Sequence, residues 1–135
     1  MAEFVMKALV KANGLEGAYH IESAAVSDEE LGNPIYPPAR RCLAQHGVWF
    51  DSDKRARTVT SSDYDRFDRI IYMDRSNLRW LGRIMPEDTE NKIHSLMSYA
   101  GKFRDVVDPW YPPCDFEKTF QDILEGCEAM LSMKL

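Results

Sequence analysis

The stretch that decides the fold is RIIYMDRSNLRWLGRIM, which runs from Arg69 to Met85. Its first five residues are mostly apolar and include two adjacent isoleucines, a composition typical of a short strand covered on both faces. The next four residues, beginning at Asp74, supply turn and helix-capping side chains. Apolar residues then recur at helical spacing, at Leu78, Leu81, Ile84 and Met85, and Pro86 ends the pattern. This strand, turn and helix form a unit typical of a parallel sheet.

The rest of the chain continues the same alternation. We expect strands and helices in the order helix 1–13, strand 18–25, helix 39–46, a short helix within 60–68, strand 69–73, helix 78–85, strand 93–99 and helix 116–133. Residues 26–38 are rich in turn formers and are expected to be a surface loop. The order predicts one α/β domain over residues 1–135, with a small parallel sheet and helices on both of its faces.

Composition excludes several classes of partner. The chain of 135 residues has a formal net charge of −5, so neither nucleic acid nor an anionic membrane is expected as its main partner. No apolar run approaches the roughly 18 residues of a spanning helix, and no basic-then-apolar leader opens the chain. We therefore expect a soluble, cytoplasmic protein.

Three cysteines, Cys42, Cys114 and Cys127, are too few and too widely spaced for a disulfide framework. No C-x-x-C pair is present, and no histidine was expected at ligand distance from a cysteine. The sequence predicts neither a metal nor an organic cofactor, and a reducing compartment fits best. Cys42 and Cys127 fall within helical patterns and are expected to be core thiols.

The segment Asp108-Pro109-Trp110-Tyr111 follows the last predicted strand. Ligands of parallel α/β sheets bind beyond the carboxyl ends of the strands, so Asp108 is placed where an active-site residue is expected. A carboxylate followed by proline and two aromatic residues suits a proton donor at the lip of a pocket. The alternative is a proline-rich turn whose Trp110 and Tyr111 cap a core.

Several blocks of sequence together resemble the low-molecular-weight protein tyrosine phosphatases, in the family's order and along the whole chain. They are Glu22-Ser23-Ala24-Ala25, Gly32-Asn33-Pro34, Gln45-His46-Gly47, Ala56-Arg57-Thr58-Val59-Thr60, Phe67-Asp68, Met73-Asp74-Arg75-Ser76-Asn77-Leu78 and Asp108-Pro109-Trp110-Tyr111. The resemblance implies the family's small parallel sheet with flanking helices. It also implies hydrolysis of phosphotyrosine monoesters through a cysteinyl-phosphate.

The resemblance assigns roles to individual residues. Asp108 would act as the general acid that protonates the leaving phenolate and then as the base that activates water. Trp110 and Tyr111 would flank the aromatic ring of the substrate. Ser23 would support the phosphate loop through its hydroxyl, and Asp74 would cap a helix.

An acidic pair, Glu29 and Glu30, stands where many family members have an aromatic or bulky residue beside the pocket. As substrate-binding residues these carboxylates would repel a phosphate dianion or select basic flanking residues. Lys54 replaces a histidine that is common in the family.

The family's reaction requires a cysteine nucleophile and an arginine in one loop, in the pattern Cys-x5-Arg. The residues six positions after Cys42, Cys114 and Cys127 are Val48, Phe120 and Met133. We therefore expect the first strand and the phosphate loop to be absent, an N-terminally truncated domain with no nucleophile, and no turnover by this chain alone. With the loop restored, the substrate would be a phosphotyrosine protein or an aryl phosphate.

Two alternatives stay open. The first is a non-catalytic interaction module, or a strand-exchanged homodimer, that uses unpaired sheet edges beside an open slot. The second is an arsenate reductase or another thiol-dependent relative on the same scaffold, which also needs the cysteine.

Overall fold

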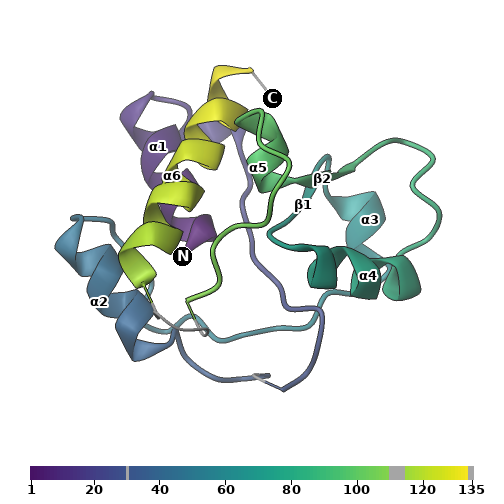
Figure 1. Cartoon of the computed structure of the whole chain (residues 1–135), viewed down its shortest axis with the longest axis horizontal. Helices are drawn as coiled ribbons and strands as arrows, with labels where there is room; N and C mark the ends of the chain where they lie inside the picture. The colour runs from purple at the N-terminus through teal and green to yellow at the C-terminus, as the bar shows by residue number, and fades with distance from the viewer. Residues whose placement is uncertain (30, 110–114, 134–135) are drawn as a thin grey trace.

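The computed structural model describes residues 1–29, 31–109 and 115–133 (Figure 1). Their elements in chain order are α1 (Ala2–Ala12), the 3-10 helix η1 (Glu16–Ala18), α2 (Pro37–Gln45), α3 (Asp63–Arg66), β1 (Ile70–Tyr72), α4 (Arg75–Ile84), β2 (Ile93–Ser95), α5 (Leu96–Tyr99) and α6 (Phe116–Ser132). Within these ranges, no helix combines the length and the hydropathy that crossing a bilayer requires.

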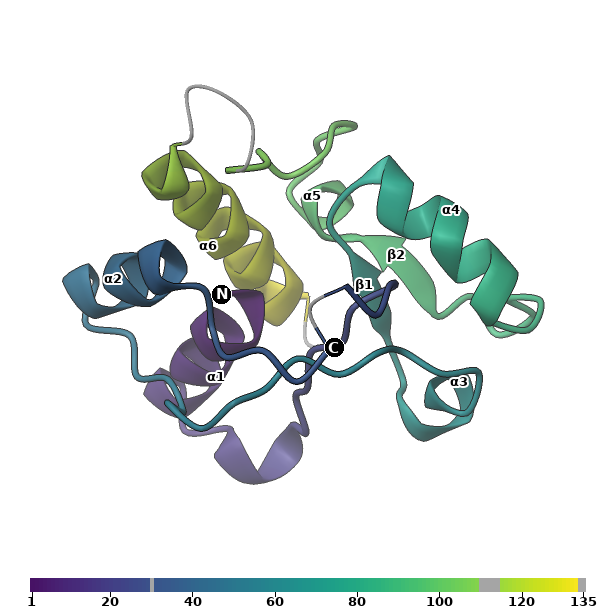
Figure 2. The same cartoon turned by 90° about the horizontal axis from the view of Figure 1, so that it is seen from below.

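The two strands form the parallel pair that the sequence predicts. Ile70 lies opposite Ile93 and Tyr72 lies opposite Ser95, and α4 makes the connection between the strands. In Figure 2, α4 lies on one side of the strands, and α1 and α6 lie on the other. The expected α/β fold, with a small parallel sheet and helices on both faces, is confirmed.

Side chains of β1 alternate between two apolar cores, as a strand covered on both faces requires. Ile71, together with Met73 just after the strand, packs against the larger core, which is built mainly by α1, α5 and α6. Ile70 and Tyr72 pack against a smaller core that contains Leu81 of α4. The strand therefore joins both halves of the domain.

The larger core depends on a close approach between α5 and α6. Leu96 and Met97 of α5 are 1% and 0% exposed. A Cβ atom added to Gly126 of α6 would lie 2.5 Å from Cγ of Leu96, so this contact requires glycine.

The predicted strand over 93–99 is wrong in its second half. The chain leaves the sheet after Ser95 and forms the short helix α5. The apolar side chains of Leu96 and Met97 satisfy a helix face against α6 as well as they would a strand. A short apolar run does not distinguish a strand from a helix. Burial against α6 selects the helix here.

The predicted strand over 18–25 is also wrong for most of its length. Its first residue belongs to η1, and only Ala25 makes a bridge, in parallel to Thr58. The Ala25 N–H donates to the carbonyl of Arg57, and the Val59 N–H donates to the carbonyl of Ala25. The preceding residues border a cavity rather than another strand, so they lack the ladder that defines one.

Helix ends follow the predicted local chemistry. The Asp74 carboxylate accepts a hydrogen bond from the Asn77 N–H at 2.7 Å, so Asp74 caps α4 as expected. Asp115 caps α6 through the Lys118 N–H at 3.0 Å. Gly47, at φ 67°, follows α2 in the left-handed conformation that terminates helices.

Candidate functional site

The segment that carries Asp108 lies near the carboxyl end of β1, whereas the sequence predicted it directly after the last strand, from which α5 separates it. The buried Val106 donates its N–H to the carbonyl of Met73 at 2.9 Å, and Met73 directly follows β1. Asp108 comes two residues later and is partly buried. This is the edge of a parallel sheet at which α/β proteins bind ligands.

Two polar residues of α6 hold the same segment. Asp122 accepts two hydrogen bonds from the Arg104 guanidinium, both at 2.8 Å, and a third from the Val107 N–H at 3.0 Å. Thr119 donates its hydroxyl to the Val107 carbonyl at 2.7 Å. Both polar groups of the Val107 backbone are therefore satisfied by α6, which fixes the residue next to Asp108.

The contacts of Asp122 and Thr119 with Val107 form a clamp on the Asp108 segment, and Arg104 acts on its carboxylate. Its hydrogen bonds hold the pKa of the Asp122 carboxyl below its usual range, against the opposing effect of burial. Asp122 is 5% exposed and Thr119 is 4% exposed. No role was predicted for either positioning residue, although polar residues on the buried side of a helix signal a partner.

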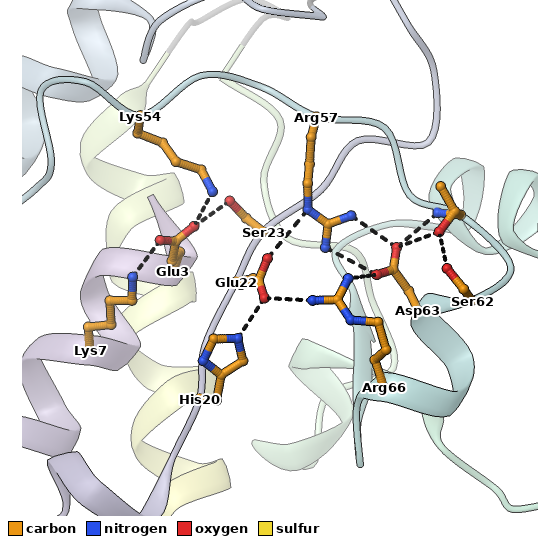
Figure 3. A network of polar contacts seen from close by, with 11 residues as sticks. Glu3, Lys7, His20, Glu22, Ser23, Lys54, Arg57, Ser62, Asp63 and Arg66 are labelled. Carbon is orange, nitrogen blue, oxygen red and sulfur yellow. Dashed lines mark hydrogen bonds and ion pairs between the residues drawn. The ribbon is translucent and has the colours of Figure 1, made fainter.

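The contact that the structure describes for Ser23 is with Glu3, and its support of a phosphate loop stays a prediction. Its hydroxyl donates to Oε1 of Glu3 at 2.7 Å, so it is tied to the first turn of α1 (Figure 3). Glu3 also pairs with Lys7 at 2.7 Å and with Lys54 at 3.0 Å. Burial raises the pKa of Glu3, but hydrogen bonds from Lys7, Ser23 and Lys54 outweigh it and lower the pKa to about 2.

A second set of charges lies beside the first (Figure 3). Asp63 is 2% exposed and accepts hydrogen bonds from Arg57 at 3.0 Å and from Arg66 at 3.3 Å. Glu22 lies 3.4 Å from the Arg66 guanidinium and 2.6 Å from Nε2 of His20. These ion pairs join the segment before Ala25 to α3, and no role was predicted for them.

A cavity of about 320 Å³ lies at the N-terminus of α1. It brings Ser23 together with Pro109, the neighbour of Asp108. Its walls are formed by Met1, Ala2, Glu3, Ser23, Ala24, Tyr36, Ala39, Met73, Pro109, Phe116 and Ile123. Free N–H groups at a helix N-terminus attract anions, whereas the ionised Glu3 carboxylate in the same wall repels them.

A larger cavity of about 580 Å³ separates residues 18–27 from β1. Ile70 donates its N–H to the carbonyl of Lys92, on the β2 side of the strand. Alternate residues of a strand direct their backbone groups to opposite edges. Ile71 therefore presents its backbone N–H and carbonyl toward the cavity. Ala25 pairs with residues 57–59, so Ala24 likewise presents its backbone groups to the cavity. Two strand-like edges therefore face each other across this cavity, whose lining is partly apolar and partly charged.

Four other predicted positions have different outcomes. Glu29 is exposed in a turn and lines neither cavity. Glu30, Trp110 and Tyr111 lie outside the described residues, so their assignment as substrate-binding residues stays a prediction.

The described cysteines are core thiols, as predicted. Cys42 is 4% exposed and Cys127 is 2% exposed, and both are free. Burial raises the pKa of Cys42, and burial raises the pKa of Cys127 to about 12. A thiol with a raised pKa is a poor nucleophile at neutral pH. Cys114 lies outside the described residues.

One sequence-based statement about metals does not hold. Sγ of Cys42, a ring nitrogen of His46 and a carboxylate oxygen of Glu117 lie within 4.8 Å of one another. Cys42 and His46 are four residues apart on one helix face, which is a spacing suited to shared ligation. That signal was present in the sequence and was overlooked.

The fold and the cavity beside the Asp108 segment define a small α/β protein with a candidate site at the N-terminus of α1. Comparison with known proteins gives the family. The model of the family "Low molecular weight phosphotyrosine protein phosphatase" matches residues 1–135. The chain belongs to this family.

Individual proteins of this family are similar to the chain along most of its length. The low molecular weight phosphotyrosine protein phosphatase of Gallus gallus is 36% identical over 135 residues, covering 97% of this chain and 84% of the relative. The protein-tyrosine-phosphatase YfkJ of Bacillus subtilis is 34% identical over 134 residues, covering 98% of this chain and 85% of the relative. The crystal structure of YfkJ matches this chain with a TM-score of 0.90, covering 98% of this chain and 83% of YfkJ. A protein tyrosine phosphatase from Entamoeba histolytica, with Hepes in its active site, has a TM-score of 0.88 at 28% identity, covering 99% of this chain and 89% of that one.

The expectation that the family's first strand and phosphate loop are missing is not borne out by these comparisons. The family model extends over residues 1–135, and a cysteine, Cys42, is present. Cys42 lies in α2, and Val48 rather than arginine stands six positions after it. The residue that acts as nucleophile is therefore not established by the family membership.

Proposed function

We propose that the protein hydrolyses phosphotyrosine monoesters, with Asp108 as general acid and then general base. The position of the Asp108 segment carries this proposal. Met73 and α6 hold the segment against the cavity at the N-terminus of α1, and Pro109 lines that cavity. A phosphoryl group bound there would lie near a proton donor for the leaving phenolate.

Ser23 and Glu3 would shape the wall of this cavity rather than take part in proton transfer. The Ser23 hydroxyl donates to Glu3, whose low pKa keeps it an ionised acceptor at neutral pH. The two residues therefore connect the segment before Ala25 to the start of α1. Removing the hydroxyl should loosen the cavity wall without changing the chemistry of Asp108.

The nucleophile is a finer part of the proposal. Since none of the three cysteines has arginine six positions later, and burial raises the pKa of Cys42, none suits a phosphate-binding thiolate. We propose that turnover needs a thiolate and an arginine in a Cys-x5-Arg segment, a pattern that none of the three cysteines begins. The chain alone would then hydrolyse an aryl phosphate no faster than its D108N variant.

The test compares the 135-residue chain with a polypeptide extended by the coding sequence immediately upstream of Met1. Aryl phosphate hydrolysis is measured for each protein with and without D108N. The expected result is turnover only in an extended protein that supplies Cys-x5-Arg, with a loss of roughly 100-fold or more in kcat on D108N. Rapid turnover by the 135 residues that C42S abolishes would instead make Cys42 the nucleophile and overturn this part of the proposal.

The substrate class is tested in the same assay. A structure titled drosophila arginine phosphatase has a TM-score of 0.85 with this chain at 28% identity. Phosphotyrosine and phosphoarginine peptides are therefore compared at equal concentration. A higher kcat/KM for phosphoarginine would contradict the proposed phosphotyrosine substrate while leaving the phosphatase assignment intact.

A second candidate function rests on the larger cavity. Two strand-like edges facing a cavity of about 580 Å³ suit the insertion of an extended strand from a second copy of the chain. Sedimentation velocity across a wide range of concentration tests this homodimer, with A24P as the variant that removes one N–H from the edge. A monomer at every concentration would contradict it.

A further inference from the structure

The end of α2 and the start of α6 bring three metal-ligating side chains together, away from the Asp108 segment. Sγ of Cys42, a ring nitrogen of His46 and a carboxylate oxygen of Glu117 lie within 4.8 Å of one another. None of the three lines either cavity. The proposed phosphatase reaction assigns no role to the cluster.

The two helices position these groups for simple reasons. Cys42 and His46 are one turn apart on α2, and Gly47 ends that helix and leaves His46 at its cap. Glu117 lies in the first turn of α6, which packs against α2. Cys42 is buried between the helices, while His46 and Glu117 are exposed at the rim, so an ion can reach the cluster from solvent.

Neighbouring side chains fix the orientation of both exposed groups. The His46 ring stacks on the Phe120 ring, with centroids 3.9 Å apart and planes inclined by 9°. Gln121 donates to Oε1 of Glu117 at 3.0 Å, and Oε2 lies 2.7 Å from Nε2 of His46. Metal ligands in proteins are held in this way by outer groups that leave one ligating atom free to face the ion.

We propose that Cys42, His46 and Glu117 form a Zn²⁺ site. Thiolate, imidazole and carboxylate are the three ligand types that proteins use for zinc. Ligand bonds of roughly 2.0–2.3 Å in a tetrahedron place the ligand atoms roughly 3.3–3.8 Å apart. The three ligand atoms already lie within 4.8 Å of one another, and water would take the fourth position.

Metal binding replaces three interactions that are present in the structure. The ion replaces the hydrogen bond between His46 and Glu117, and it displaces the thiol proton of Cys42, which passes to solvent. It also replaces the long contact of 3.7 Å between the Cys42 sulfur and the Phe116 carbonyl. Because burial raises the pKa of this thiol, the proton competes with the metal.

The site would join α2 to the helix that holds the Asp108 segment. Glu117 is two residues before Thr119 in α6, and Thr119 accompanies Asp122 in the clamp on Val107. Zinc would therefore stabilise the start of α6 and the contact between these helices. This inference does not depend on the proposed phosphatase activity.

The test is a titration of the reduced 135-residue chain with Co²⁺, followed by displacement with Zn²⁺. We expect one equivalent of Co²⁺ to give a thiolate-to-cobalt absorption band and tetrahedral visible bands, both removed by Zn²⁺. C42S should abolish the thiolate band. H46Q and E117Q change exposed residues, so they should fold normally and bind Co²⁺ at least 10-fold more weakly, while Q121A should weaken binding roughly 10-fold.

C127S is the matched control, because Cys127 is also a buried thiol of α6 but is not part of the cluster. It should keep the full absorption band. The absence of a thiolate band in the unmodified chain would overturn the proposal. So would a band that survives in C42S, or an affinity that H46Q and E117Q leave unchanged.

Discussion

Replacing Asp122 by alanine should release the segment that carries Asp108. The carboxylate accepts a charged hydrogen bond from the Val107 N–H, worth about 1.5–3 kcal/mol where it is buried. Its pair with Arg104 adds no more than about 1 kcal/mol, because the Arg104 side chain is 43% exposed and water can replace the carboxylate. We expect D122A to lower the free energy of unfolding by about 2–4 kcal/mol, which lowers Tm by roughly 10 °C for a domain of this size.

The assay that isolates the clamp is hydrogen exchange at the Val107 amide. A loss of about 2–3 kcal/mol in local stability corresponds to roughly 30- to 160-fold faster exchange. D122N is the control, because its amide oxygen still accepts from Val107 while the charge is lost, so exchange should stay slow. T119V should have a smaller effect, about 1 kcal/mol, because it leaves the Val107 carbonyl without one neutral donor.

The pH dependence of D122A follows from the direction of the Asp122 pKa. The pKa is lowered in the folded state, mainly by hydrogen bonds from Arg104. The stabilisation is therefore complete above the unfolded pKa, near pH 4, and is lost as pH falls through the folded value. The difference in Tm between D122A and the unmodified chain should shrink below about pH 4. Unchanged Val107 exchange in D122A at pH 7 would refute the clamp.

Three further changes test the packing, the capping and the charges. G126A should destabilise the domain by about 1–3 kcal/mol, because its Cβ would overlap Leu96, whereas G82A meets nothing within 4 Å and should stabilise α4 by about 0.5–1 kcal/mol; thermal unfolding compares the two. D74A should cost about 1 kcal/mol in chemical denaturation, because the cap of α4 is lost. E3Q should lower stability at pH 7 but have little effect at pH 2. The folded pKa of Glu3, about 2, lies below its unfolded pKa, so the stabilisation is lost as pH falls from the unfolded pKa to the folded one. A Tm difference that is constant with pH would contradict this.

Local chemistry predicted most of the fold. Proline at the entry of α2, the Asp74 cap and the glycine after α2 are each read from a few neighbouring residues, and the structure confirms them. The prediction failed where burial rather than local pattern decides. Leu96 and Met97 suit a strand or a helix equally, and the close contact with Gly126 in α6 selects the helix.

In the candidate site, too, local order predicts one feature and misses another. The place of Asp108 after a strand follows from the order of elements, because all parallel strands end at the same edge. The clamp on Val107 does not follow, since Asp122 lies 15 residues away from it in the chain. The sequence nevertheless contains a signal for such contacts. Thr119 and Asp122 are polar residues on the buried side of an amphipathic helix. A buried polar group must find a partner, so their spacing predicts that α6 holds another segment, although it does not say which one.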